Sequence, residues 1–249
     1  QTVLVKGVDD TIIDGDQFAE IVVSVDNNSD SNFLLESPQN VNVINHDNDF
    51  AKIIITPLDR LTGEDLSSGS FSIRLNSTPT SPVQISFSSS NVNEGKLVSS
   101  TIIISPLDWN KSKIISVIGV DDLIPIRDGA IDYNIFINSI SSPDPYYGNI
   151  IPGSIGPLVM TNQDNDFAGV TLYLLEDDNQ TDENGDLAKI AFSLNTKPLN
   201  GEDVVIPLAL QDNVDEIALL ETEVKIENQF WDKPESNVIT LTGLDDLLL

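Results

Sequence analysis

The chain repeats itself at a long interval, and this repeat limits its architecture more than any other feature. The phrase NHDNDFA ends at Ala51 and the phrase NQDNDFA ends at Ala168, which is 117 positions later. A second phrase occurs as VKGVDD, VIGVDD and LTGLDD, which end at Asp10, Asp122 and Asp246. A period of about 115 residues matches one ordinary domain and far exceeds the roughly 20–50 residues of a solenoid repeat. The sequence therefore predicts an array of whole domains.

The phase of the repeat divides the chain into three parts. Residues 50–166 form one complete repeat, residues 1–49 the C-terminal part of a preceding repeat, and residues 167–249 the N-terminal part of a following one. We expect the chain to be a window on a longer array. The two outer parts together have about the length of one domain. An alternative is therefore that the tail of one molecule completes the head of another and builds a filament by strand exchange.

Short apolar runs between clusters of Pro, Asn, Ser, Asp and Gly indicate an all-β fold. No stretch keeps a 3.6-residue helical period, and β-branched residues dominate the apolar runs. Seven runs in the complete repeat are typical of an immunoglobulin-like sandwich; they cover residues 51–57, 70–75, 83–88, 98–105, 113–119, 132–138 and 156–161. We predict tandem immunoglobulin-like antiparallel β-sandwiches with about seven strands in each repeat.

Acidic residues concentrate at one predicted end of this sandwich. If successive strands run alternately up and down, every second connection falls at the same end. Nine of the twelve carboxylates of residues 50–166 map to that end: Asp59, Glu64, Asp65, Glu94, Asp121, Asp122, Asp128, Asp164 and Asp166. Asp108 and Asp144 map to the opposite end, and Asp132 begins a strand. So many carboxylates at one end would repel one another strongly unless cations neutralise them.

The composition favours calcium as that cation. Forty acidic and twelve basic residues give a net charge of −28, which argues against nucleic acid and anionic membranes as partners. The chain has one histidine and no cysteine, so zinc lacks its usual ligands. Calcium accepts six to eight oxygens from carboxylates, amides and backbone carbonyls, whereas magnesium keeps its waters. A solvated acidic rim without bound metal is the alternative interpretation.

The motifs resemble a known family. GVDDTIIDGDQFAEIVVS and the later VNVINHDND are similar to the Calx-beta domain, and more closely to the tandem Calx-beta-like repeats of large bacterial surface and adhesin-type proteins. The complete repeat carries the same frame in LDWNKSKIISVIGVDD, RDGAIDYNIFI and MTNQDND. In that family, calcium is held at one tip of the sandwich by acids from several loops.

The resemblance implies calcium ligands in all three parts of the chain. In the complete repeat they are Glu64, Asp121, Asp122, Asp128, Asp164 and Asp166. In the preceding repeat they are Asp9, Asp10, Asp14, Asp47 and Asp49, and in the following repeat Glu183, Asp245 and Asp246. The complete repeat departs from the pattern where an insertion brings Pro125 and Arg127, and where Ala130 replaces the acid found at Asp16.

Other conspicuous residues suggest structural roles. Trp109 and Trp231 recur just before equivalent strands and are expected to plug the end of the sandwich opposite the acids. Tyr146 and Tyr147 lie in a Pro- and Gly-rich loop, where packing is favoured over ligand contact. His46 is replaced by Gln163 in the next repeat, so we assign it no function. With no phosphate-binding loop and no plausible Ser-His-Asp set, we expect no enzymatic activity.

These inferences predict a calcium-stiffened segment of an extracellular stalk or filament in a large repetitive bacterial surface protein. Its partners would be neighbouring repeats of the same chain or copies of itself, with no nucleic acid and no direct membrane insertion. A module that binds a surface glycan or a protein is the alternative from another functional class.

Overall fold

The computed structural model describes residues 2–34, 37–122, 125–175, 180–212 and 215–245. The regular secondary structure of these residues consists almost entirely of β-strands, which confirms the predicted all-β fold class. The single α-helix among them, α1 (Pro145–Gly148), is one turn long. Short 3-10 turns occupy Pro106–Asp108, Pro152–Ser154, Leu199–Gly201, Asn228–Phe230 and Pro234–Ser236. No helix in the described parts of the chain is long and apolar enough to span a lipid bilayer.

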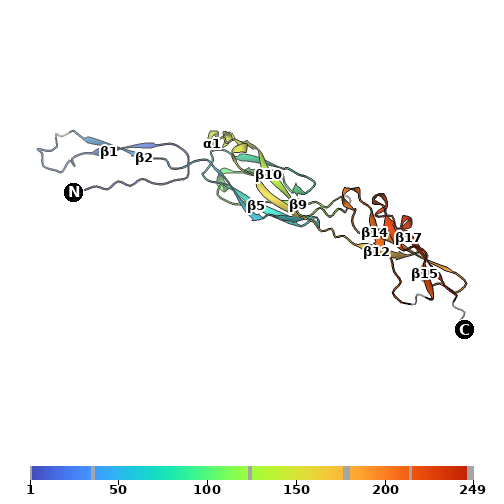
Figure 1. The fold of residues 1–249 in the computed structure, drawn as a ribbon. Coiled ribbons are helices and arrows are strands. Elements are labelled where there is room, and N and C mark those ends of the chain that lie inside the picture. Colours follow the sequence, from blue (N-terminus) through green and yellow to red (C-terminus); the bar gives the residue numbers. More distant parts are fainter. Residues whose placement is uncertain (1, 35–36, 123–124, 176–179, 213–214, 246–249) are drawn as a thin grey trace.

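The middle of the chain forms a two-layered sandwich (Figure 1). One sheet has four antiparallel strands in the order β3 (Ile53–Asp59), β5 (Ser68–Leu75), β9 (Lys113–Gly119) and β7 (Gly95–Leu97). The other has the order β4 (Leu61–Gly63), β11 (Leu158–Gln163), β10 (Ile131–Ser141), β6 (Val83–Ser89) and β8 (Thr101–Ile104). The two sheets reproduce the strand arrangement of an immunoglobulin-type sandwich.

Alternating apolar side chains from both sheets build the core of this sandwich. Phe71, Ile73 and Leu75 of β5 are at most 1% exposed, as the two-residue period of the strand requires. Opposite them, Val83 and Ile85 of β6 are fully buried. Burial of these side chains supplies most of the stabilisation of the sandwich, at about 25 cal/mol per Å² of apolar surface removed from water.

All seven predicted strands are present, and two further strands extend the sheets. The additional strands β4 and β7 have three residues each and contain glycine, so neither shows a period that identifies a strand. β4 continues the path of β3 after a bulge and pairs in parallel with β11 in the opposite sheet. The continuous segment of β3 and β4 therefore contributes to both sheets and closes one side of the sandwich.

Residues before the sandwich form a two-stranded hairpin. β1 (Gln17–Val23) pairs antiparallel with β2 (Gln39–Asn45), in a register that sets Gln17 opposite Asn45. The strands have no other sheet neighbour among the described residues. Most of their side chains are exposed, including Phe18 and Val22.

Residues after the sandwich form two smaller sheets. One has the order β12 (Val170–Leu174), β13 (Leu187–Leu194), β17 (Val238–Gly243) and β15 (Ile217–Leu219). The other contains β14 (Val204–Pro207) and β16 (Glu223–Ile226). A small core that includes Phe192, Ile226 and Ile239 lies between them. Figure 1 shows the hairpin, the sandwich and these sheets in a row, with the two termini at opposite ends.

Candidate metal centre

Four connections meet at one end of the middle sandwich, which we call the acidic pole. Their described residues are 64–67, 90–94, 120–122 with 125–130, and 164–166. Backbone hydrogen bonds join them, from Glu64 N–H to Gln163 C=O at 3.0 Å and from Val120 N–H to Glu94 C=O at 3.2 Å. A third bond runs from Gly119 N–H to Ser67 C=O at 3.0 Å. These bonds hold the acidic loops together where their strands end.

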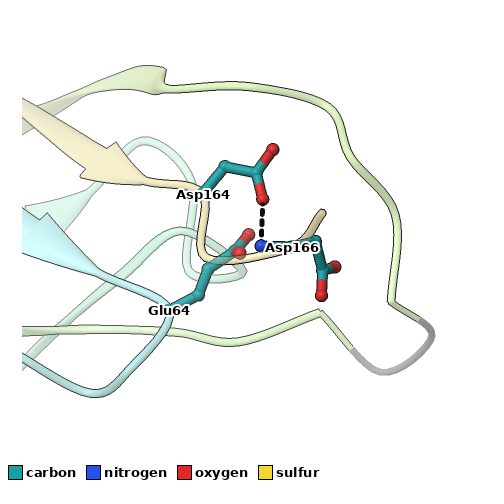
Figure 2. Close-up of side chains that lie close together, drawn as sticks. All are labelled: Glu64, Asp164 and Asp166. Carbon is teal, nitrogen blue, oxygen red and sulfur yellow. Dashed lines mark hydrogen bonds between the residues drawn. The ribbon is translucent and has the colours of Figure 1, made fainter. Parts of the chain in front are cut away.

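Glu64 is the most buried acid of the acidic pole. It follows β4 and is only 4% exposed. Its Oε2 accepts a hydrogen bond of 2.9 Å from the backbone N–H of Asn165, in the loop that follows β11. Asp164 accepts a hydrogen bond from the backbone N–H of Asp166 at 2.6 Å, which bends this loop back on itself. Figure 2 shows the three carboxylates of Glu64, Asp164 and Asp166 gathered beside that bend.

Glu64 belongs to two groups of carboxylates. One oxygen from each of Glu64, Asp164 and Asp166 lies within 4.8 Å of the others. Glu64 also forms such a group with Asp122 and Asp128 from the loop between β9 and β10. The two groups share a buried acid, so they form one cluster of five acids drawn from three connections. Oxygens this close to one another can be bridged by a single hard cation or by two neighbouring ones.

Two oxygens of the cluster are buried without a hydrogen-bond partner. They are Oδ2 of Asp122 and Oδ2 of Asp166, and each belongs to a side chain that is only partly exposed. A buried charged oxygen without a partner costs free energy, and native structures keep such groups rare. A bound cation would supply the missing partner for both oxygens, so the residues present fit a metal ion.

The proton affinity of the cluster reflects the same crowding. Burial raises the pKa of Glu64 from 4.5 to about 7, and the neighbouring Asp164, Asp122 and Asp166 charges contribute to this rise. Burial also raises the pKa of Asp122, with further contributions from Asp128 and Glu94. The pKa of Asp166 rises for the same main reason. The negative form of these groups is therefore disfavoured unless a positive charge accompanies it.

No basic side chain neutralises the cluster within the described residues. The ion pairs found there lie elsewhere: His46–Asp16, Lys111–Asp108, Lys225–Asp203 and Lys233–Asp232. Arg127, in the same connection as Asp122 and Asp128, is exposed. The available ligands are oxygens alone, which suits calcium and gives zinc neither nitrogen nor sulfur.

Three other acids that the sequence predicts at this end lie outside the cluster. Asp121 is exposed, and its charge raises the pKa of Asp122 and of Asp166. Asp59 and Asp65 are exposed and accept hydrogen bonds from the backbone of Leu61 and Ser67. The structure thus brings five of the six implied ligands of the complete repeat together and leaves Asp121 at the rim.

Asn162 supports the cluster, although the sequence analysis did not single it out. It is 1% exposed at the end of β11. Its side-chain amide donates to the backbone oxygen of Val120 at 2.9 Å and to Glu94 Oε2 at 3.2 Å. Its oxygen accepts from the Thr62 hydroxyl at 3.0 Å. The signal that marks it is repetition, because Asn45 of the hairpin donates to Val8 in the same way, at 3.2 Å.

The hairpin reproduces part of this arrangement. Asp47 accepts from Gly15 N–H at 2.7 Å and from Asp49 N–H at 2.8 Å, as Asp164 accepts from Gly129 and Asp166. Burial and the charges of the other acids raise the pKa of Asp49. One depression is lined by all five implied ligands: Asp9, Asp10, Asp14, Asp47 and Asp49. Among the described residues, no three of these oxygens lie within 4.8 Å of one another, and Glu64 has no counterpart there.

The third set of implied ligands does not form a group of three acids among the described residues. Glu183 is exposed and stands in the position of Glu64, since the backbone of Asp182 packs on Gly243 as that of Gly63 packs on Gly119. Asp245 is exposed, and Asp246 lies outside the described residues. Within the part of the chain that the structure describes, no group of three acids forms around Glu183 or Asp245.

The aromatic residues occupy structural positions. Trp109 and Trp231 each pack against a core, and each backbone oxygen accepts a 2.8 Å bond from an equivalent strand residue, Leu75 or Leu194. Tyr147 is fully buried, and its hydroxyl donates to the backbone oxygen of Ser77 at 2.8 Å. Tyr146 remains 48% exposed. The loop that carries these tyrosines is therefore packed on the sandwich through Tyr147.

Fold and site together define an immunoglobulin-like β-sandwich with an acidic cluster at one end. No protein-family model and no curated protein matches the sequence. Among solved structures, CBD12 from CALX1.2 is 11% identical, with 77% of this chain and 75% of that chain covered and a TM-score of 0.29. The chaperone–tip adhesion subunit complex CsuC–CsuE, from archaic chaperone-usher pili of Acinetobacter baumannii, is 6% identical, with coverage of 71% and 83% and a TM-score of 0.30. WR4, a C. elegans MSP family member, is 9% identical, with coverage of 45% and 95% and a TM-score of 0.28.

These scores are too low to extend any property of those proteins to this chain. The resemblance to Calx-beta-like repeats therefore stays a prediction from the sequence motifs.

Proposed function

We propose that the chain is a calcium-braced segment of an extracellular stalk or filament, with a structural role. The observation that carries this proposal is the pair of buried carboxylate oxygens, on Asp122 and Asp166, that lack a hydrogen-bond partner beside the buried acid Glu64. A solvated acidic rim would keep its carboxylates exposed. This cluster instead removes charged oxygens from water and surrounds them with other acids.

Calcium would be held by Glu64, Asp122, Asp128, Asp164 and Asp166. Their carboxylates come from three connections, so an ion among them would join the ends of β4, β9 and β11. Bound calcium supplies positive charge and accepts the irregular oxygen geometry of loops, whereas magnesium demands a near-ideal octahedron. The protein's own contribution is to hold the loops in register through Asn162 and the backbone bonds between them.

The junction before the sandwich involves the acidic loop of the hairpin. Thr78, at the end of the sandwich opposite the acidic pole, donates its backbone N–H to Thr11 C=O at 2.7 Å. The two threonine hydroxyls are also 2.8 Å apart. Ser77 donates its hydroxyl to the Phe50 backbone oxygen at 3.1 Å and so fixes the connecting segment. Thr11 directly follows Asp10, so the loop that carries implied ligands also contacts the next part of the chain.

The junction after the sandwich repeats this contact. Lys197 donates its backbone N–H to Pro125 C=O at 2.9 Å. Lys197 stands where Thr78 stands in the sandwich, because NTKP and NSTP follow equivalent strands. Pro125 lies between Asp122 and Asp128, which both belong to the cluster. At both junctions, an acidic loop therefore bonds to the opposite end of the next part.

Calcium at the acidic pole would stiffen these junctions as well as the loops. Without the ion, repulsion between the carboxylates would favour open loops and weaken the bond from Pro125 to the next part. With millimolar calcium outside a cell, the loops would be ordered and the parts would form a stiff rod. Extracellular sites of this kind have dissociation constants of about 10⁻⁴–10⁻³ M. Neighbouring repeats are then the principal partners.

Thermal unfolding of the chain in calcium and in chelator tests this proposal. At about 10 mM calcium, a site with that affinity stabilises the folded form by about 1.4–2.7 kcal/mol. For a domain of this size, the midpoint should rise by about 4 °C or more. Sodium chloride at equal ionic strength is the control, because a solvated rim would respond to screening alone. A calcium-specific shift below about 1 °C, with no heat of binding in calorimetry, would contradict the proposal.

A further inference from the structure

The side of the middle sandwich next to β3 is open. β3 is an edge strand, and among the described strands only β5 pairs with it. In the opposite sheet, β4 pairs with β11 only from Thr161 to Gln163, so the beginning of β11 has no neighbour on that side among the described strands. The space between β3 and the beginning of β11 is therefore not closed by a described strand.

Two adjoining hollows lie in this space, and together we call them the flank groove. Their volumes are about 510 and 470 Å³. Lys52, Ile53 and Ile155 line both hollows, so the groove is continuous along β3. One hollow extends to Ile151 and the other extends to Arg60. Hollows of this size hold the apolar side chains of a bound molecule.

The floor of the flank groove is apolar. Ile53 is 5% exposed and Leu158 is 8% exposed, and both belong to the core of the sandwich. Ile55 and Ile155 are partly buried and pack against the same core. The groove therefore follows the edge of the hydrophobic core, and a segment that covered these side chains would remove apolar surface from water.

The backbone of β3 offers hydrogen-bonding groups to a segment in the groove. Lys52 C=O accepts from Asn76 N–H at 2.9 Å, which makes these two residues a bonded pair of the ladder with β5. Bonded and non-bonded pairs alternate along an antiparallel ladder, so Ile54 also bonds toward β5. The N–H and C=O groups of Ile53 and Ile55 therefore point away from β5, to the open side.

A proline and a bulge end this open ladder. The register with β5 shifts between Pro57 and Asp59, and Pro57 has no N–H to donate. Features of this kind restrict pairing at the edges of sheets. Here they leave Ile53 and Ile55 accessible, and they limit an added strand to about five residues opposite residues 53–57.

The described residues that line the flank groove carry only positive charge. Lys52 and Arg60 are both exposed, and no acid is among the described residues that line the groove. Neither base forms an ion pair within the part of the chain that the structure describes. The whole chain has forty acidic residues and twelve basic ones, so this charge is a local reversal. Two unpaired bases beside an apolar floor match a ligand that carries carboxylates.

We infer that the flank groove binds an extended acidic segment of another protein, which adds to the sheet as a strand beside β3. The backbone of the segment bonds to Ile53 and Ile55, and its alternate side chains cover the apolar floor. Its carboxylates reach Lys52 and Arg60. Backbone bonds along a sheet edge, with hollows for every second side chain, are the features by which sheets bind peptides as added strands.

This ligand goes beyond the proposed stalk, because it gives one side of the sandwich a binding partner. No acid of the calcium cluster is among the described residues that line the groove. Peptide binding measured in chelator therefore tests the inference whether or not the calcium proposal holds.

Selection from a displayed library of random peptides of about nine residues, panned on the whole chain in chelator, tests the ligand class. We expect the enriched peptides to alternate apolar and polar residues and to carry Asp or Glu toward their ends. Fluorescence anisotropy of a labelled enriched peptide then gives its affinity. A library that yields no binding peptide, or only basic ones, would overturn the inference.

Charge reversal at the groove tests where the enriched peptide binds. Lys52→Glu and Arg60→Glu change exposed side chains, and each should lower the affinity at least tenfold. Lys96→Glu is the matched control, because Lys96 is exposed on β7, at the opposite edge of the same sheet. It makes the same change in net charge and should leave the affinity unchanged. Equal losses in all three variants would show a response to overall charge alone and would overturn the inference.

Amide hydrogen exchange measured by NMR tests the strand pairing. In the free chain, the N–H of Ile54 should exchange slowly and those of Ile53 and Ile55 quickly, because only the first bonds to β5. The enriched peptide should slow the exchange of Ile53 and Ile55. Protection that appears only in other strands would overturn the inference.

N-methylation of the peptide separates strand addition from the binding of a merely apolar molecule. Alternate amides of an added strand face β3, so one alternate set of N-methyl groups should abolish binding and the other set should preserve it. Equal affinities of the two methylated peptides would contradict an added strand.

Sedimentation velocity without peptide tests whether a second copy of the chain is the occupant instead. Any self-association of the chain should be the same for the wild type and for Lys52→Glu. Self-association that Lys52→Glu abolishes would assign the groove to a second copy and overturn the inference of a separate partner.

Discussion

The carboxylate of Glu64 accepts a hydrogen bond at 2.9 Å from the backbone N–H of Asn165, which lies 101 positions later in the chain. This bond joins the connection after β4 to the connection after β11. It also places a buried acid beside Asp164 and Asp166, with which it shares one group of close oxygens.

Replacing Glu64 by Gln should weaken calcium binding while leaving the fold intact. The amide oxygen can still accept from Asn165 N–H, but the shared ligand of both carboxylate groups loses its charge. We expect calorimetry to show an affinity at least tenfold lower, which corresponds to about 1.4 kcal/mol. Asp65→Asn is the matched control, because Asp65 is the exposed neighbour that bonds only locally to Ser67. Equal losses in both variants would contradict a specific role for Glu64.

Asp122→Asn and Asp166→Asn should have opposite effects with and without calcium. Each substitution removes a buried charge that has an unpartnered oxygen, so the calcium-free melting temperature should rise by a few degrees. In calcium, each variant loses a ligand and the ion-induced rise should shrink. Differential scanning calorimetry in both buffers measures these effects. A fall in both conditions would indicate that the acids act only as structural hydrogen-bond acceptors.

The calcium-free protein should lose stability as the pH rises. The pKa of Glu64 is raised by burial from 4.5 to about 7 in the folded protein. Between these values the folded form binds more protons than the unfolded form, so the free energy of unfolding falls with increasing pH. Melting temperatures measured from about pH 4.5 to 8 should show this decline, and Glu64→Gln should flatten it. Saturating calcium should also reduce this decline, because the ion stabilises the ionised form of the buried carboxylate. A profile that rises with pH in calcium-free buffer would be inconsistent with the buried acid.

Sequence reasoning predicted the strands and the end at which the acids gather, because both follow from strict alternation. Phe71, Ile73 and Leu75 share a face by their two-residue spacing, and strand parity places Glu64, Asp122 and Asp166 at one end. It could not predict β4 and β7, whose three residues show no period. Nor could it predict that Asp122 joins the cluster while Asp121 stays exposed, because the burial of adjacent loop residues depends on the folded path of the loop.

The role of Asn162 was hidden for a related reason. A polar amide side chain at the end of a strand is usually exposed, so a buried Asn162 was not expected from the sequence. Its two-residue spacing from Met160 nevertheless places it on the inner face of β11. Only the folded structure shows that it bonds to Val120, Glu94 and Thr62 together. In the outer parts, the described residues among the predicted ligands do not form a group of three close acids.

Tyr147→Phe should destabilise the sandwich without changing calcium binding. The lost hydroxyl donates to Ser77 C=O at 2.8 Å and accepts from Ser77 N–H at 3.0 Å in a fully buried site. An unsatisfied buried backbone group costs about 1–3 kcal/mol, which chemical denaturation can measure. Tyr146→Phe, on the half-exposed neighbour, should change stability little. A calcium affinity altered by Tyr147→Phe would imply that the loop communicates with the acidic pole.

Calcium should narrow the range of distances across the junction after the sandwich, where Lys197 bonds to Pro125. Spin labels attached to the introduced cysteines of the double variant Lys96→Cys and Glu202→Cys would report this distance by double electron–electron resonance spectroscopy. Both positions are exposed, and the chain has no native cysteine. We expect a broad distribution in chelator and a narrower one in calcium, because the loop holding Pro125 becomes ordered. The same labels on the Glu64→Gln background should stay broad at the same calcium concentration. Distance distributions of equal width with and without calcium would contradict the proposal that the ion stiffens this junction.

The most direct measurement is a crystal structure of the chain grown with calcium, with the ion located by its anomalous scattering. We predict an ion bound by oxygens of Glu64, Asp122, Asp128, Asp164 and Asp166, at distances of about 2.3–2.6 Å. The Oδ2 atoms of Asp122 and Asp166 should then have their missing partner. An acidic pole without anomalous density, with these carboxylates turned out into solvent, would contradict the proposed calcium site.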